Sequence, residues 1–303
     1  MWTTVPKRTV CLQSAAKLKY KDNHLVIDGK EATARIPLED IWVLILESHE
    51  VVISTALLAA LGSEGIGVIV CGRNHMPIAL QLPLGAHSRH AAIVEDQLLI
   101  SKPLSKRLWQ LIIKRKIENQ ALCLSMLGLD GVDSLLTLAK EVRSGDTTGR
   151  ESVAASSYFR SYLSEGTRRE GPYAPLLDYG YAILRAGIAR CAVSGGWLVS
   201  RGLHHCSDLN AFNLVDDLIE PFRPVVDLLA KECEVPEGLS AGNKMILTRL
   251  FECTVEIDGE KYSVQSAIEE ELDSLKRAVR SNDASCLRLP RLCAVQFADM
   301  ERR

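Results

Sequence analysis

The stretch Gly202–Asp227, which reads GLHHCSDLNAFNLVDDLIEPFRPVVD, combines two adjacent histidines with three closely spaced acids. These side chains are His204, His205, Asp216, Asp217 and Glu220. Apolar residues surround the acids, so at least some of the carboxylates must lie near apolar surface. A carboxylate there loses hydration, and it persists only beside a cation, a hydrogen-bond donor or a metal. The stretch is therefore a candidate active site.

The spacing within this stretch limits which side chains can act together. Asp216 and Asp217 lie four and three residues before Glu220, spacings that place side chains on one helical face. Pro221 lacks an N–H group and ends or restarts the helix, so Glu220 is expected at a helix junction. Adjacent residues cannot face the same way on a regular element, so we expect one of the two histidines in the chemistry. The pattern leaves a site and an ordinary structural role equally open.

One histidine with two carboxylates forms a hard, mixed nitrogen and oxygen ligand set. Such a set is typical of Mg²⁺ or Mn²⁺, whereas zinc normally takes more nitrogen or sulfur. A site of this kind supports phosphoryl transfer. Neither GxxxxGK[ST] nor GxGxxG occurs in the chain, which argues against a nucleotide-driven reaction.

Composition describes an ordinary globular protein. The 303 residues predict about two domains, and the net charge of −2 argues against a protein that coats nucleic acid by bulk charge. The nine cysteines include no CxxC pair, so the sequence signals neither a zinc ribbon nor a dithiol redox centre. We find no signal-peptide pattern and no apolar run long enough for a membrane span, so we expect a cytoplasmic protein without a membrane partner.

The fold class expected is α+β with two domains. Residues 1–84 predict a small, sandwich-like, β-rich domain with one short helix at Thr55–Leu61. The expected strands are Thr9–Leu12, His24–Ile27, Ala32–Ile36, Ile41–Leu46, Gly67–Cys71 and Ile78–Leu82. Pro83–Ala86 is the expected boundary, because the hydrophobic period changes from about 2 to about 3.6 beyond it.

Residues 85–303 predict a larger, all-α catalytic domain. The expected helices lie around 108–119 and at 131–143, 151–165, 175–198, 240–252 and 261–280. The one expected β interruption is a hairpin at Thr254–Val264, where Asp258 and Gly259 form a turn signal.

Glu151 stands at the start of a helix whose core-facing stripe repeats every three to four residues. An acid in the first turn is favoured by the helix dipole, and this ordinary interpretation is the better one from spacing alone. The small side chains of Ala154 and Ala155 allow another element to approach closely, which favours a site.

Basic residues cluster in the helix around Trp109 and again at Arg168 and Arg169. For one cluster, a solvated helix face is the better explanation. Several clusters in a neutral protein with a phosphoryl-transfer site favour a nucleic-acid track. The acid-free run from 102 to 116 contains Lys102, Lys106, Arg107, Lys114, Arg115 and Lys116. The candidate DNA-contacting residues are Lys106, Arg107, Lys114, Arg115, Arg168 and Arg169.

Four segments together resemble the CRISPR-associated integrase, the adaptation subunit that inserts new spacers into the array. The stretch Gly202–Asp227 resembles the family signature. Leu108–Gln120 (LWQLIIKRKIENQ) resembles a helix of the type II branch, and Glu151–Phe159 matches the first catalytic motif. Leu176–Ala186 (LLDYGYAILRA) resembles a core helix, although Asp178 replaces the usual asparagine.

The resemblance implies that Glu151, His205 and Glu220 are catalytic and hold Mg²⁺ or Mn²⁺, with Asp217 as an auxiliary acid. His205 is preferred to His204 because family members usually keep the second histidine. The implied reaction is attack of a spacer 3′-hydroxyl on a phosphodiester of the CRISPR repeat, a transesterification without ATP.

The same resemblance implies a set of partners. The DNA would be the spacer precursor and the CRISPR repeat. Residues 1–84 would form a homodimer, and a small adaptation partner protein would complete a heterohexamer. Contact with an RNA-guided effector nuclease is a further expectation, as is a role in antiviral defence in a prokaryotic cytoplasm. The alternatives are a non-catalytic DNA-binding scaffold and a metal-dependent phosphoesterase that acts on small substrates.

Overall fold

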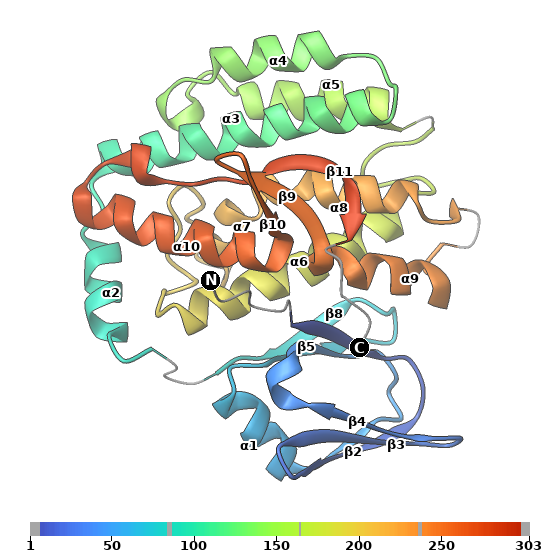
Figure 1. Ribbon diagram of the computed structural model, residues 1–303. Coiled ribbons are helices and arrows are strands. Elements are labelled where there is room, and N and C mark those ends of the chain that lie inside the picture. The colour runs from blue at the N-terminus through green and yellow to red at the C-terminus, as the bar shows by residue number, and fades with distance from the viewer. Residues whose placement is uncertain (1–6, 84–86, 164, 236–237, 298–303) are drawn as a thin grey trace.

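The computed structural model describes residues 7–83, 87–163, 165–235 and 238–297. Figure 1 shows strands and one short helix at the bottom, and a larger assembly of helices above them. We call residues 7–83 the N-terminal part and residues 87–297 the helical part. The α+β class and the order of strands before helices are as the sequence predicts.

The N-terminal part contains two four-stranded sheets and one helix. The first sheet has the order β1-β5-β7-β8, with β8 antiparallel to β7 and the other pairs parallel. The second has the order β4-β3-β2-β6. The elements are β1 (Arg8–Leu12), β2 (Ala16–Lys21), β3 (His24–Gly29), β4 (Thr33–Pro37), η1 (Leu38–Asp40), β5 (Ile41–Leu46), β6 (Val52–Ile53), α1 (Thr55–Ser63), β7 (Gly67–Cys71) and β8 (Pro77–Gln81).

Strand β5 is buried along its whole length because its two faces belong to different cores. Ile41 and Leu44 pack in the core shared by the two N-terminal sheets and α1. Trp42, Val43 and Ile45 point the other way and pack in the core of the helical part. A strand buried on both faces has a continuous apolar sequence, and Ile41–Leu46 (IWVLIL) has one.

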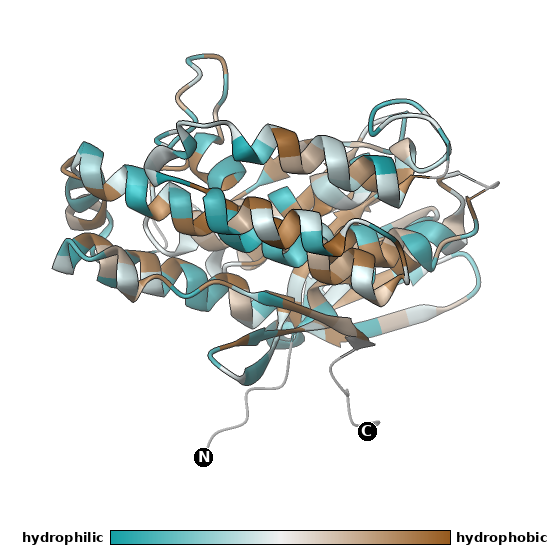
Figure 2. Cartoon of the chain, turned by 90° about the horizontal axis from the view of Figure 1, so that it is seen from above, coloured by the Kyte–Doolittle hydropathy of each residue, from teal (hydrophilic) through white to brown (hydrophobic). Residues whose placement is uncertain are grey.

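The helical part is organised around one long central helix, α3, whose neighbours include α4, α5, α8 and β11. The helices are α2 (His90–Leu98), α3 (Lys102–Met126), α4 (Val132–Glu141), α5 (Arg150–Tyr162), α6 (Ala174–Ser194), α7 (Asn213–Leu218), α8 (Arg223–Lys231), α9 (Ala241–Thr248) and α10 (Val264–Ser281). The single turns are η2 (Ser144–Asp146), η3 (Glu220–Phe222), η5 (Arg249–Glu252) and η6 (Ala284–Cys286). In Figure 2, hydrophilic and hydrophobic residues alternate along the helices, as amphipathic packing requires.

A three-stranded sheet, β10-β9-β11, interrupts the helices. β9 (Cys253–Ile257) and β10 (Glu260–Ser263) form the predicted hairpin around Asp258 and Gly259. β11 (Arg291–Phe297) pairs with the other edge of β9. The prediction that the hairpin is the one β element of an otherwise all-α region was therefore wrong. The pairing of β11 with β9 crosses more than thirty residues, and the sequence has no local turn signal for such a contact.

Other element boundaries follow the sequence closely, with a few differences. Strands β2 and β6 and helix α2 were not predicted, and the helix expected at 261–280 gives its first residues to β10. The helix expected at 175–198 ends at Ser194. The expected domain boundary at Pro83–Ala86 falls on residues 84–86, which lie outside the described residues, so the division there stays a prediction. Among the described residues, none of the helices is both long and apolar enough to cross a membrane.

Candidate active site

Helix α3 supplies the base of the candidate site. Ser101 caps its first turn by accepting a hydrogen bond from Leu104 N–H. Farther along, Trp109, Lys116 and Asn119 lie on the buried side of the helix and reach separate parts of the stretch Gly202–Asp227. One rigid helix therefore sets the relative positions of the histidines and the acids.

His205 is oriented by Asp217. The carboxylate of Asp217 is fully buried, and its Oδ1 lies 2.8 Å from His205 Nδ1. The same carboxylate accepts backbone hydrogen bonds from Leu203, His204 and His205. The hydrogen bond that His205 donates to Asp217 raises the pKa of His205, although partial burial opposes the shift. Because a carboxylate only accepts, Nδ1 is the donor, and Nε2 is left to face outward.

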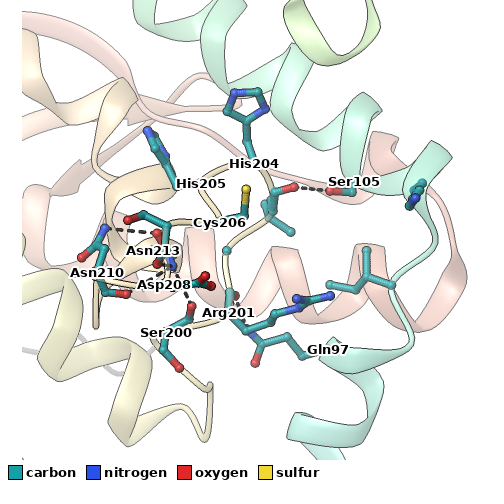
Figure 3. A pocket seen from close by; sticks show the side chains of 15 residues that line it. Gln97, Ser105, Ser200, Arg201, His204, His205, Cys206, Asp208, Asn210 and Asn213 are labelled. Atoms are coloured by element: carbon teal, nitrogen blue, oxygen red, sulfur yellow. Dashed lines mark hydrogen bonds between the residues drawn. The ribbon is translucent and has the colours of Figure 1, made fainter.

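The loop between α6 and α7 is folded tightly around Asp217. A Cβ atom on Gly202 would lie 2.4 Å from His205 O and 2.6 Å from Asp217 Oδ2, so only glycine fits there. Asn213 Nδ2 donates to the carbonyls of Ser200 and Ser207, as the dashed lines in Figure 3 show. Figure 3 also shows the bond by which Ser105 of α3 ties the loop to the helix.

The two histidines have separate roles, as expected for adjacent residues. The His204 ring stacks on Trp109, with ring centroids 4.3 Å apart and planes 1° apart. His205 meets the edge of the same indole at 5.6 Å. His204 therefore packs against α3, while His205 is the histidine that lines a pocket together with Glu220.

Glu220 lies at the helix junction that Pro221 predicts. Helix α7 ends at Leu218, the single turn η3 begins at Glu220, and α8 begins at Arg223. Asn119 Nδ2 fixes the junction from α3 by donating to Pro221 O at 2.7 Å. Arg223 Nε donates to Glu220 Oε1 at 2.9 Å.

Lys116 joins Glu220 to Glu151. Its Nζ lies 2.5 Å from Glu220 Oε2 and 2.7 Å from Glu151 Oε1. Burial alone favours neutral Glu220, but Arg223 and Lys116 outweigh it and lower the pKa of Glu220 to about 2. Burial likewise opposes the charge of Lys116, while the two carboxylates raise its pKa overall. Glu220 and Lys116 therefore form a charged pair at neutral pH.

Glu151 reaches this cluster from the first turn of α5. Asp146 holds the start of that helix, because its carboxylate accepts hydrogen bonds from the N–H groups of Arg150 and Glu151. Ala154 and Tyr158 are buried on the same helix face. The expected core-facing stripe is present, and the acid at its end meets a cation that belongs to another helix.

A pocket of about 410 Å³ opens beside His205 and Glu220. Its wall includes Arg168, Arg185 and Arg223. The ring of Tyr181 separates two of these guanidinium groups, with Arg168 Cζ 4.8 Å and Arg223 Cζ 4.7 Å from its centroid. Arginines around a pocket that also carries an acid and a histidine suit a phosphate ligand.

The donor set suits a hard divalent cation. Glu151, His205 and Glu220 supply one nitrogen and two carboxylates, the ligand types that Mg²⁺ and Mn²⁺ accept. Within the described residues, however, no three acidic, histidine or cysteine side chains converge as a metal cluster. In this structure the two carboxylates converge on the ammonium group of Lys116.

A model of the family described as "CRISPR associated protein Cas1" matches residues 10–233. The chain belongs to the Cas1 family. A CRISPR-associated endonuclease Cas1 from Neisseria meningitidis serogroup C (strain 8013) is 38% identical over 292 residues, covering 94% of this chain and 96% of the relative. The resemblance drawn from the four sequence segments is thereby confirmed.

Solved structures share the fold. A casposase bound to an integration product has a TM-score of 0.74 at 17% identity, covering 98% of this chain and 94% of its own. A Cas1 protein from Thermotoga maritima has a TM-score of 0.71 at 19% identity, covering 90% and 97%. A chain of a partial Cas6-RT-Cas1–Cas2 complex has a TM-score of 0.59 at 17% identity, covering 93% and 98%.

The basic residues expected to contact DNA differ in their exposure to solvent. Lys106, Arg107, Lys114 and Arg169 are exposed, whereas Arg168 is half-buried and lines the pocket beside Glu220. The half-buried Arg115 pairs with Glu118. DNA contact by these residues stays a prediction.

Two residues of the basic helix differ from expectation. Trp109 is buried and stacks on His204, so it adds no exposed aromatic surface to a nucleic-acid track. Lys116 is buried in the site instead of lying on a basic surface. A signal for Lys116 was present in the sequence, because it shares a helix face with Ile112, Ile113 and Gln120.

Arg185 and Arg223 were also missed as parts of the site. Arg185 Nε donates to Asp216 Oδ1 at 2.6 Å, which removes Asp216 from the set of free carboxylates. Arg223 follows Glu220 by three residues, a spacing at which side chains meet on a helix. That spacing was readable from the sequence, whereas the pairing of Arg185 with Asp216 depends on tertiary packing.

Proposed function

We propose that this Cas1-family chain is a metal-dependent DNA endonuclease and integrase that inserts spacer DNA into a CRISPR array. One observation carries the proposal: Glu151 and Glu220 come from distant parts of the chain and converge on one positive charge, beside a histidine oriented by a buried aspartate. The casposase relative, whose structure contains an integration product, supports this reaction class through its shared fold.

The reaction conserves phosphodiester bonds. The 3′-oxygen of a spacer strand forms a bond to a phosphorus of the CRISPR repeat, while the bond between that phosphorus and its own 3′-oxygen breaks. The hydroxyl proton ends on the leaving oxygen. Because one phosphodiester bond replaces another, no ATP is consumed. Bound Mg²⁺ or Mn²⁺ would lower the pKa of the attacking hydroxyl and neutralise charge on the phosphate.

Different residues of the chain would hold the metal, orient its histidine ligand and contact the DNA. Glu151, His205 and Glu220 would hold the metal, and Asp217 keeps the His205 ring turned so that Nε2 is available. Arg168, Arg185 and Arg223 line the pocket, where each is paired with an acid of the same wall and would share its remaining N–H donors with a phosphate group. Lys106, Arg107, Lys114, Arg115 and Arg169 would extend the DNA contact away from the site.

The proposed assembly has two kinds of protein partner, a second copy of the chain and a small adaptation protein. Residues 1–84 would form a homodimer, and a small adaptation protein would bridge two such dimers into a heterohexamer. The Cas1–Cas2 complex among the structures with this fold supports a partner of that kind. The partners and the prokaryotic cytoplasmic location come from the family resemblance.

The decisive experiment is strand transfer on a branched DNA substrate. Wild-type protein is assayed with Mn²⁺ or Mg²⁺ and again with EDTA, beside Glu220→Ala and a control, Glu232→Ala. Glu232 is exposed at the end of α8. We expect joining that requires metal, falls on the order of 10²- to 10³-fold in Glu220→Ala, and is unchanged in the control.

Other outcomes identify the alternatives. DNA binding without joining, even with the small partner protein added, would favour a non-catalytic scaffold. Metal-dependent hydrolysis of small phosphoesters, with no preference for branched DNA, would favour a phosphoesterase. Joining that survives EDTA would reject the metal-dependent mechanism.

A further inference from the structure

Lys116 is a buried cation inside a helix whose other basic residues are mostly exposed. Its side chain is 9% exposed, compared with 47% for Lys114 on the same helix. A buried ammonium is costly unless it is closely paired. Both partners of Lys116 are carboxylates that the proposed function assigns to the metal, Glu151 and Glu220.

The two oxygens of Glu220 are held in different ways. Oε1 accepts a directed hydrogen bond from Arg223 at 2.9 Å, and this bond is independent of Lys116. Oε2 lies 2.5 Å from the Lys116 ammonium in a close ion pair. Glu220 can therefore lose Lys116 and still be oriented by Arg223.

Asn119 adds a second independent support. It lies one helical turn after Lys116 and donates to the carbonyl of Pro221, the residue that follows Glu220. It also donates to Pro290 O and accepts from Leu292 N–H. The backbone at Glu220 is therefore fixed to α3 by contacts that do not pass through the Lys116 side chain.

We propose that Lys116 is the built-in counter-ion of the metal centre: its ammonium holds Glu151 and Glu220 together before metal binds, and the metal enters by displacing it. This inference rests on the proposed assignment of those two carboxylates to the metal. Lys116 is a positioning residue, and its ion pairs stabilise the metal-free protein while competing with metal.

The inference predicts opposite effects on stability and metal affinity. Removing the ammonium leaves Glu151 and buried Glu220 facing each other with only Arg223 beside Glu220 as a cation, so the metal-free protein melts at a lower temperature. The same change removes the competitor and the repulsion that an ammonium exerts on a divalent cation. Mn²⁺ therefore binds more tightly.

The test compares Lys116→Met with Lys114→Met in the full chain. Isothermal titration calorimetry gives the dissociation constant for Mn²⁺, and thermal unfolding is followed in EDTA and in saturating Mn²⁺. We expect Lys116→Met to bind Mn²⁺ at least roughly tenfold more tightly than wild type. Its melting temperature should be lower than that of wild type in EDTA, and it should rise more than that of wild type when Mn²⁺ is added. Lys114→Met removes an equal charge from the same helix and should match wild type in metal affinity.

Weaker or unchanged Mn²⁺ binding by Lys116→Met would overturn the inference. Glu220→Gln separates this failure from failure of the proposed function. If Glu220→Gln binds Mn²⁺ as wild type does, Glu220 is not a ligand and the proposed metal site is wrong. If Glu220→Gln loses Mn²⁺ while Lys116→Met is unchanged, only the role of Lys116 is wrong.

A measurement on wild-type protein covers the case in which Lys116→Met does not fold. In lysine-labelled protein without metal, a buried, ion-paired ammonium gives a protected ¹⁵Nζ signal, assigned by its absence from Lys116→Arg. We expect saturating Mg²⁺ to shift or remove that signal while the signal of Lys114 stays. A Lys116 signal unaffected by Mg²⁺ would contradict displacement.

Discussion

Glu220 and Asp227 lie seven residues apart in one stretch of sequence and are both buried, at 4% and 1% exposure, yet their pKa values shift in opposite directions. Burial is opposed at Glu220 by Arg223 and Lys116, which lower its pKa to about 2. Burial dominates at Asp227 and raises its pKa to about 6. The direction in which the pKa of a buried acid shifts therefore depends on whether its partner is a cation or a neutral hydroxyl group.

Asp227 is held by tyrosines. Tyr181 donates to Oδ1 at 2.5 Å, Tyr158 donates to Oδ2 at 2.8 Å, and Tyr162 donates to the backbone carbonyl. Hydroxyl groups satisfy the carboxylate without supplying charge. Asp227 is therefore suited to joining α5, α6 and α8, whereas Glu220 keeps a full negative charge that a cation can use.

The first test of the difference between Glu220 and Asp227 replaces each acid with the neutral amide of the same shape. We expect Glu220→Gln to reduce metal-dependent strand transfer on the order of 10²- to 10³-fold, because a charged ligand is lost. Asp227→Asn should leave strand transfer close to wild type, because Asn keeps an oxygen that accepts from tyrosine. Equal losses in the two variants would mean that Asp227 also takes part in the chemistry.

The second prediction concerns the pH dependence of stability at Asp227. The folded protein holds this proton more tightly than the unfolded chain, whose carboxyl has a pKa of 3.8. The resulting stabilisation is fully present below that value and is lost as the pH rises through about 6, by about 3 kcal/mol in total.

Urea unfolding of wild type and Asp227→Asn at several pH values between about 4 and about 7 measures this effect. The difference in unfolding free energy between the two proteins should shrink as the pH rises. Comparing the two proteins cancels the titration of groups that they share. A difference that is constant across this range would show that Asp227 is ionised throughout.

The third prediction sharpens the role of Asp217. Asp217→Asn keeps the size of the side chain but weakens its hold on His205, so we expect Mn²⁺ affinity and strand transfer to fall by about 10- to 100-fold. Calorimetry and the joining assay measure the two effects. The matched variant Asp216→Asn, whose wild-type carboxylate pairs with Arg185, should lose less metal affinity. The reverse order would place Asp216 next to the metal.

The smallest expected effect concerns Glu271, a third kind of buried acid. It lies fully buried on α10, and among the described residues neither carboxylate oxygen has a hydrogen-bond partner. Burial raises its pKa well above the ordinary value. Glu271→Met should therefore stabilise the protein by about 1 kcal/mol near neutral pH, measured by urea unfolding. A loss of stability would reveal a partner for this carboxyl.

Much of the N-terminal part follows from local sequence. Ile41–Leu46 and Gly67–Cys71 form strands with the predicted bounds, because continuous apolar runs of this length are typical of parallel strands. Strand β2 was missed although Ala16 and Leu18 alternate with exposed lysines, the usual pattern of a half-buried strand.

The sequence indicated Glu151, His205 and Glu220 as candidate site residues, but it did not place Lys116, Arg185 or Arg223 beside them, and it predicted only part of the arrangement. The helix junction at Glu220 follows from Pro221, which acts locally. The meeting of Glu151 and Glu220 on Lys116 depends on how α3, α5 and η3 pack, and no local pattern encodes that packing. A basic residue within an apolar helical stripe was the one local sign, and a run of other lysines and arginines obscured it.

Strand β5 has a consequence for the integrity of the whole chain. Trp42 and its neighbours on that face belong to the helical core, and Trp42 also meets Phe251 at a ring-centroid distance of 4.5 Å. Arg190 of α6 donates to Gly65 O of the N-terminal part. If the sheets were separated from the helices, buried apolar side chains of both parts would become exposed to solvent. The protein should therefore melt as one cooperative unit, with a single calorimetric transition.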